Sequence, residues 1–148
     1  MGIVVLGAVF VDIKGYPLSA YIPGGRNAGR IEQVHGGVSR NVVEDIANVE
    51  LRPTFVSLVD DTGMGQDVIN KLDTTPLTGL LKEKGDEIFA DCDAIALELD
   101  LEKDTVKQVL HYAKKYNKKV FAAISNMSIA MERRDFLQQI DCFVCNQQ

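Results

Sequence analysis

Short apolar segments that alternate with helical patterns are the feature of this sequence that most restricts its fold. The apolar segments are continuous runs rich in Val, Ile, Leu and Ala, which is typical of strands buried on both faces of a parallel sheet. They are 3–11, 54–59, 93–99, 119–124 and 141–145. Helical periodicity between such segments predicts parallel βαβ units. We therefore expect a three-layer α/β/α sandwich with a mostly parallel sheet.

The helical pattern is clearest in 102–116, where the apolar side chains fall on one face and lysines cluster late. The members of that face are Val106, Val109, Leu110 and Ala113. The other expected helices are 39–49, 63–72 and 132–139, and Ser39 is available as a capping residue. Segment 77–90 is expected to form only one or two short helical turns, and 18–22 and 29–34 are expected to be short strands.

Length and charge restrict the class of protein. A chain of 148 residues predicts a single α/β domain over 1–148. A net charge of −5 argues against nucleic-acid binding, because phosphate partners select basic surfaces. The apolar run near the amino terminus has no basic residues before it and is too short for a membrane helix, so we expect a cytoplasmic protein without membrane contact.

The three cysteines have no disulfide spacing, which favours a reducing compartment. Cys142 and Cys145 form a single C-x-x-C inside an apolar strand pattern. Without a second pair or a nearby His, we interpret them as buried thiols and expect no metal site there.

A glycine pair, Gly36-Gly37, precedes the helix expected at 39–49. Two positions without a Cβ let backbone amides approach a ligand, and the helix that follows directs its free N–H groups toward the same place. Asn41, in the first turn, both donates and accepts hydrogen bonds. This combination suits a small ligand rich in hydroxyl groups. A tight loop without any ligand is the alternative.

Two carboxylates follow apolar runs. Asp12 ends the first run and Glu98 lies near the end of a later one, and ligands gather at the carboxyl ends of parallel strands. A carboxylate there can accept hydrogen bonds from two neighbouring hydroxyl groups. The alternative is a solvated turn residue for Asp12 and an exposed strand end for Glu98. His35 borders the glycine pair and is a further candidate contact.

Several of these motifs, in the same order, resemble the ribokinase-like (PfkB-type) carbohydrate kinases. The motifs are HGGVSRN at 35–41, DDTGMG at 60–65 and IVVLGAVFVDIKGY at 3–16. GGVSRN and the D-x-x-G-Y after the first strand are most similar to the pseudouridine-kinase branch. The resemblance implies a small partial β lid over 14–36 and ATP-dependent phosphorylation of a sugar or nucleoside hydroxyl with Mg²⁺. It also allows a homodimer.

The resemblance assigns roles to particular positions. It implies substrate contacts at Asp12, Gly36, Gly37 and Asn41, with Glu98 as a weaker candidate. It also implies a place for Asn146 near the phosphates of the nucleotide.

The sequence departs from the family pattern in two places. Further lid strands are expected after Leu72, where only a few residues are present. Either most of the lid is lost, or a loop is missing from the sequence at this point. The chain also stops at Asn146-Gln147-Gln148, before the segment that carries the catalytic Asp and most of the ATP site. We therefore expect these residues to be the amino-terminal, substrate-binding half, without a catalytic residue and inactive alone. Phe10 stands where relatives often have Asn, which leaves the acceptor open.

A non-catalytic sugar-binding or regulatory module is the second interpretation of the same sequence. A nucleotide-dependent oxidoreductase is disfavoured, because Gly7 has no G-x-G-x-x-G around it. A phosphoacceptor receiver domain is disfavoured too, since the acidic pair that it needs after the first strand is missing.

Overall fold

The computed structural model describes all residues except 1, 60–62, 66–79, 125–126 and 146–148. Its core is a five-stranded parallel sheet with the strand order β4-β1-β5-β6-β7. The strands are β4 (Thr54–Val56), β1 (Ile3–Leu6), β5 (Ala94–Glu98), β6 (Lys119–Ile124) and β7 (Cys142–Cys145). The predicted α/β fold with a parallel sheet is confirmed.

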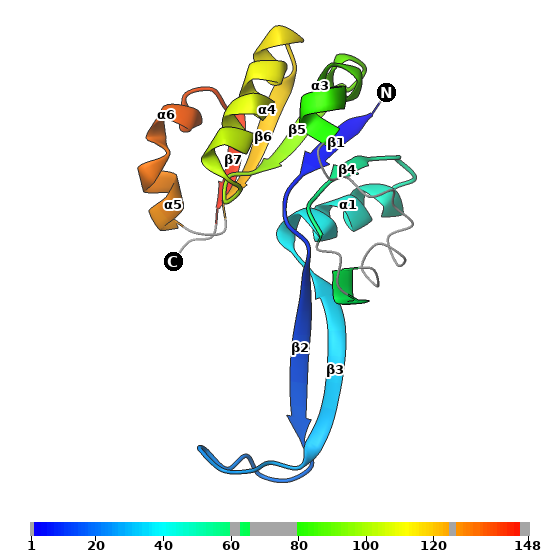
Figure 1. Cartoon of the computed structure of the whole chain (residues 1–148), viewed down its shortest axis with the longest axis vertical. Coiled ribbons are helices and arrows are strands. Elements are labelled where there is room, and N and C mark those ends of the chain that lie inside the picture. Colours follow the sequence, from blue (N-terminus) through cyan, green and yellow to red (C-terminus); the bar gives the residue numbers. More distant parts are fainter. Residues whose placement is uncertain (1, 60–62, 66–79, 125–126, 146–148) are drawn as a thin grey trace.

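Helices cover both faces of this sheet (Figure 1). On one face, Val4, Ile95 and Val120 are register partners, and all three are buried together with side chains of α3 (Leu80–Ala90) and α4 (Lys103–Lys115). On the other face, α1 (Val38–Asn48) packs against β1 and β5. Removing this apolar surface from water stabilises the fold.

Helix α4 follows the sequence pattern closely. Its buried residues are the four that the periodicity predicted: Val106, Val109, Leu110 and Ala113. Helix α3, in contrast, is continuous over eleven residues, so the prediction of short turns was wrong. Its central Gly85 allows close packing, because a Cβ there would lie 2.4 Å from the Tyr112 ring of α4. Phe89, one turn later, stacks on the same ring at 5.2 Å.

The first apolar run is not one strand. It divides at Gly7 into β1 and β2 (Phe10–Pro17), and β2 leaves the sheet. Gly7 donates its N–H to Val56 O at 3.2 Å, at the end of the parallel pairing. The prediction that Asp12 ends a strand of the parallel sheet was therefore wrong, because Asp12 lies within β2.

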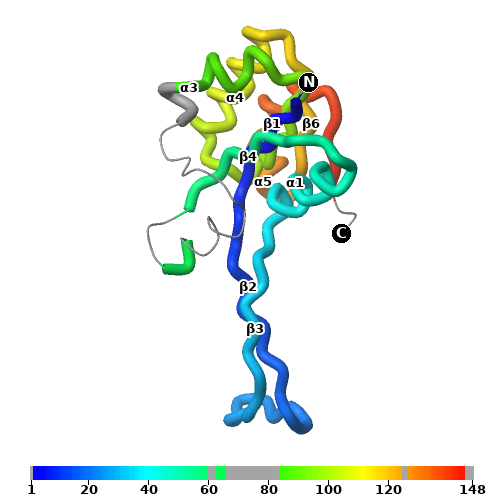
Figure 2. Tube along the Cα trace, turned by 90° about the vertical axis from the view of Figure 1, so that its right-hand side faces the viewer, coloured from blue at the N-terminus to red at the C-terminus, as the bar shows by residue number. Residues whose placement is uncertain are grey.

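Strand β2 pairs antiparallel with β3 (Gly29–Gly36) and forms a two-stranded ribbon that projects far from the sheet (Figures 1 and 2). The predicted strand 18–22 is instead part of the connection at the tip. There the Asn27 side chain accepts a hydrogen bond from Ile22 N and donates one to Ile22 O. An Asn that satisfies backbone groups in this way favours a turn over a strand.

Two helix predictions also need correction. Ser39 is not the cap of α1, because Gly37 takes that position and Ser39 is buried inside the first turn. The single helix predicted over 132–139 is replaced by α5 (Met127–Glu132) and α6 (Arg134–Leu137). Residues 63–65 are helical, whereas the rest of the helix predicted over 63–72 lies outside the described residues.

Among the described residues, no helix has the length and hydropathy needed to cross a membrane.

Candidate functional site

The base of the hairpin brings the predicted acid and the predicted glycines together. Asp12 and Val34 are partners in the ribbon, and Gly36 pairs with Phe10 on the same face. The carboxylate of Asp12 leans over Gly36, because a Cβ on that glycine would lie 2.6 Å from Asp12 Oδ2. Any side chain at position 36 would therefore displace the carboxylate. Asp12 itself is exposed, so its oxygens are accessible.

Gly37 connects the hairpin to α1 in a conformation that favours glycine. Its φ of 114° lies in a region that residues with a side chain rarely adopt. A Cβ there would also lie 2.5 Å from Ala8 O. The carbonyl of Gly37 accepts the N–H of Asn41 at 3.0 Å, which fixes Asn41 in the first turn of the helix. The glycine pair is thus required by backbone conformation and by close packing.

This end of α1 is suited to an electron-rich ligand. No side chain caps the helix at Gly37, and its first turn contains no acidic residue. The free N–H groups and the positive end of the helix dipole favour a ligand that accepts hydrogen bonds. Asp12, beside Gly36, is an acceptor for hydroxyl groups. Donors and an acceptor are therefore close neighbours, as binding of a polyol requires.

Glu98 lies deeper than the sequence indicated. It is 3% exposed, and its Oε2 accepts hydrogen bonds from Ala8 N at 3.0 Å and from Ser39 Oγ at 2.9 Å. The alternative of an exposed strand end is therefore excluded. A substrate contact by Glu98 stays a prediction. Gly7 is required here too, since a Cβ would lie 1.6 Å from Ser39 Oγ. Sequence reasoning missed both Ser39 and Gly7 as neighbours of Glu98.

The other side chains near the glycine pair differ in the face that they take and in their contacts. His35 pairs with Val11, on the face of the ribbon opposite to Asp12. Arg40 is held by Glu44, with Nη1–Oε2 and Nη2–Oε1 distances of 2.7 and 3.2 Å, and its Nη1 also donates a hydrogen bond to Oδ1 of Asn41 at 3.2 Å. Phe10 shares the face of Asp12 and is 52% exposed. Of these residues, Phe10 is the one whose register directs it toward the same side as the carboxylate.

The remaining sequence motifs give little chemistry. Asn146 and the acidic pair at 60–61 lie outside the described residues. Within the described part of the chain, no group of three His, Cys, Asp or Glu side chains could hold a metal ion.

The cysteines differ from the sequence interpretation. Cys92 is buried, and this burial raises the pKa of its thiol. Cys142 and Cys145, in contrast, are exposed, so their interpretation as buried thiols was wrong. They lie on an edge strand, where few neighbours cover them. Three residue steps along an extended strand place their Cα atoms about 10 Å apart, too far for a disulfide bond.

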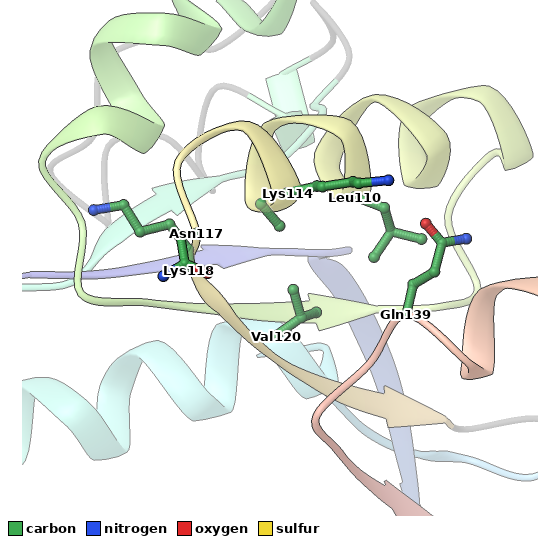
Figure 3. A pocket seen from close by; sticks show the side chains of 7 residues that line it. Leu110, Lys114, Asn117, Lys118, Val120 and Gln139 are labelled. Carbon is green, nitrogen blue, oxygen red and sulfur yellow. The ribbon is translucent and has the colours of Figure 1, made fainter.

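A cavity of about 400 Å³ lies at the other end of the sheet, where β6 begins (Figure 3). Leu110, Val120 and Gln139 are among its lining residues, with two lysines at its rim. Ligands of open parallel sheets bind at the carboxyl ends of the strands, whereas this cavity is at the amino end of β6. We therefore take the base of the hairpin, not this cavity, as the candidate site.

No protein-family model matches the chain. The guanosine-inosine kinase of Exiguobacterium acetylicum is 26% identical over 185 residues, covering 99% of this chain and 61% of that protein. The aligned region exceeds the 148 residues of the chain, so the kinase has residues within it that lack a counterpart here. A shortened lid after Leu72 would produce such a difference, and so would a loop missing from the sequence there. The chain thus spans less than two thirds of its relative.

Solved structures give the same fold. A carbohydrate kinase from Agrobacterium tumefaciens has a TM-score of 0.80 at 19% identity, with 96% of this chain and 59% of that chain covered. The ribokinase from Giardia lamblia has a TM-score of 0.77 at 15% identity, with 98% and 58% covered. The ribokinase of Arabidopsis thaliana, solved with ribose and ATP, has a TM-score of 0.75 at 16% identity, with 97% of this chain and 59% of that chain covered. The chain therefore has the fold of the ribokinase-like carbohydrate kinases.

Proposed function

We propose that this chain forms the acceptor side of an ATP-dependent kinase that phosphorylates a hydroxyl group of a sugar or nucleoside. The observation that carries the proposal is the position of the Asp12 carboxylate over Gly36, beside Gly37 and the uncapped start of α1. Asp12 accepts hydrogen bonds from neighbouring hydroxyl groups of the acceptor. The backbone N–H groups and Asn41 orient the same ligand from the helix side.

Phosphoryl transfer depends chiefly on positioning and on neutralisation of charge. In this proposal the described residues contribute the positioning. ATP supplies the phosphoryl group, with Asn146 near its phosphates. The described residues do not fit a Mg²⁺ site, since they contain no suitable group of ligands, and no step is assigned to the ion. We expect these 148 residues alone to transfer no phosphoryl group, and ATP-dependent product formation by them would contradict that.

The acceptor site can be tested by binding. In a thermal-shift panel of pentoses, hexoses and nucleosides, including pseudouridine, guanosine and inosine, we expect a selective rise in melting temperature. Asp12→Asn keeps the size of the side chain but loses the charge. It should weaken binding about tenfold to a hundredfold, the range for a hydrogen bond to a charged group.

Glu32→Gln is the matched control for that test. Glu32 lies on the same face of the ribbon, farther from Gly36, and pairs with Arg30 at 2.5 Å. We expect this variant to bind as the wild type does. The proposal is wrong if no compound of the panel shifts the wild type, or if Asp12→Asn binds with unchanged affinity.

Phe10 favours a nucleoside over a free sugar as the acceptor. Its half-exposed ring shares a face with Asp12 and is opposite Gly36, which has no side chain to cover it. A base stacked on an aromatic ring gains about 1–3 kcal/mol. We therefore expect Phe10→Asn to weaken nucleoside binding about fivefold to a hundredfold and to leave ribose binding unchanged. Equal losses for both would exclude the stacking role. Pseudouridine remains the preferred candidate from the sequence motifs.

The far face of the hairpin supports a homodimer. Ile13 and Ile31 lie on the face opposite to Asp12 and are 61% and 72% exposed. Apolar side chains exposed on a projecting ribbon often mark a contact surface. We expect sedimentation equilibrium to show a dimer in a buffer that matches the pH and ionic strength of the cytoplasm. Ile31→Lys should make it monomeric, whereas Lys14→Ala, on the other face, should not.

A non-catalytic binding module from the same fold is the second candidate. It shares the acceptor site and its binding predictions. It differs in the parent-length protein, where the enzyme would consume ATP in the presence of the bound acceptor and the module would not.

A further inference from the structure

Glu98 is the point at which three segments of the candidate site are joined. It is the last residue of β5, and Ala8 lies in the connection between β1 and β2. Ser39 belongs to the first turn of α1. One carboxylate oxygen of Glu98 accepts hydrogen bonds from both, at 3.0 and 2.9 Å. The end of a sheet strand is thereby connected to the start of the hairpin and to the start of the helix.

These hydrogen bonds reach the residues proposed to hold the ligand. The carbonyl of Ala8, whose N–H is bound to Glu98, lies 2.5 Å from the place that a Cβ of Gly37 would take. A shift of Ala8 would therefore change the space available to Gly37. On the helix side, Ser39 lies between Gly37 and Asn41, which are themselves joined by a backbone hydrogen bond at 3.0 Å.

The burial of Glu98 shows that this arrangement is not incidental. A carboxylate that is 3% exposed costs free energy unless hydrogen bonds compensate it. Ser39 is also 3% exposed, and its hydroxyl lies closer to Glu98 than to Leu6 O, which is 3.4 Å away. Its single proton is therefore donated to the carboxylate, the stronger acceptor. Gly7 leaves the space that both side chains occupy.

We propose that Glu98 and Ser39 are positioning residues, which act on the acceptor through Ala8, Gly37 and the first turn of α1. This inference rests on the proposed function, because it concerns the same site. A direct contact between Glu98 and the acceptor gives a different expectation for Ser39: loss of the serine hydroxyl would then leave binding unchanged. The serine thus separates positioning from contact.

The test compares four variants of the chain by isothermal titration with guanosine, pseudouridine and ribose. Glu98→Ala should raise the dissociation constant about tenfold to a hundredfold, and Ser39→Ala should raise it by a smaller factor, about three- to tenfold. Glu98→Gln retains an oxygen that can accept both hydrogen bonds and should recover most of the affinity. Glu102→Gln, an exposed residue four positions along the chain, is the control and should bind as the wild type does.

The temperature is chosen so that circular dichroism shows every variant fully folded. A residue that only stabilises the fold would then change the melting temperature but not the dissociation constant. Unchanged binding by Ser39→Ala would overturn the positioning role. If the wild type binds none of the compounds, the proposed function fails, and the NMR measurement below decides the role of Glu98 separately.

That measurement needs no ligand. The amide of Ala8 should exchange with solvent at least about tenfold faster in Glu98→Ala, because it loses a hydrogen bond to a charged group. The amide signals of Gly37 and Asn41 should shift in Glu98→Ala and Ser39→Ala but not in Glu102→Gln. Signals of Gly37 and Asn41 that remain in place would show that Glu98 does not position the site.

Discussion

The parallel sheet and the β2–β3 hairpin use similar apolar residues in opposite environments. Val4, Ile95 and Val120 of the sheet are at most 2% exposed, whereas Ile13 and Ile31 of the hairpin are more than half exposed. The sheet has helices on both faces, and the described part of the chain places no second layer on the ribbon (Figure 1). Strand-forming sequence alone therefore does not bury a strand. A hairpin without such a layer is only marginally stable in water.

The largest expected effect is the loss of a core side chain. Phe89 is fully buried and stacks on Tyr112, so Phe89→Ala leaves a cavity at the centre of the sheet-helix interface. We expect it to lower the free energy of unfolding by about 3–5 kcal/mol. Urea denaturation followed by circular dichroism measures this. A loss below about 1 kcal/mol would show that the core is looser than the burial indicates.

Gly37 should be the next most sensitive position. A Cβ would both meet Ala8 O and occupy a backbone conformation with φ 114°. We expect Gly37→Ala to cost about 1–3 kcal/mol in the same denaturation measurement. Gly15→Ala is the control, because β2 leaves open space around that glycine and its φ is not positive. Equal effects at both positions would contradict the strain assigned to the base of the hairpin.

A substitution on the ribbon itself should matter much less. Ile31→Thr keeps a β-branched side chain in β3 and should change the free energy of unfolding by less than about 0.5 kcal/mol. The measurement is made at low protein concentration, where subunits are dissociated. A larger loss that grows with protein concentration would show that another copy covers this face, and would revise the comparison between sheet and hairpin.

The smallest effect is expected at the surface where α3 meets the end of α4. There, Lys115 Nζ and Tyr116 Oη donate hydrogen bonds to Asp86 Oδ1 at 2.5 and 2.7 Å. The hydrogen bond from Lys115, and then that from Tyr116, lowers the pKa of Asp86 below 3.8. A carboxyl group whose pKa is lower in the folded state stabilises the fold above its unfolded pKa. That contribution is lost as pH falls through the folded pKa.

Asp86→Asn should therefore lower the urea midpoint slightly at pH 7 and not at pH 2. At the alkaline side, the hydrogen bond to Asp86 raises the pKa of Lys115 above 10.5 and that of Tyr116 above 10.0. Their contribution is present at neutral pH and is lost as pH rises through these raised values. A difference between the two proteins that is independent of pH would argue against this ion pair as its source.

The sequence was sufficient for the parts of the fold that local periodicity determines. The buried face of α4 and the bounds of β6 could be predicted, because helical and strand patterns there agree with burial. The division at Gly7 could not, since the residues on both sides are equally apolar and only packing against Ser39 distinguishes them. Helix α3 continues through Gly85 for a similar reason: the close Tyr112 ring comes from a distant part of the chain.

The candidate site was predictable where chemistry is local. Asp12, Gly36, Gly37 and Asn41 could be singled out from the glycine pair, the following helix and the acid after the first run. The register that places Asp12 over Gly36 depends on hairpin pairing, which the short predicted strands did not contain. The partners of Glu98 are 59 and 90 residues away in sequence, so no local pattern reveals them.

The length of the hairpin has one more consequence. Eight residues per strand, at about 3.3 Å each, make an arm roughly 25 Å long that joins the rest of the chain at Ala8 and Gly37. A rotation of about 10° about these two residues would displace the tip by roughly 4 Å. Asp12, which is close to them, would hardly move. Fluorescent dyes on the tip and on the edge strand β7 would therefore magnify angular changes too small to detect beside the acid itself.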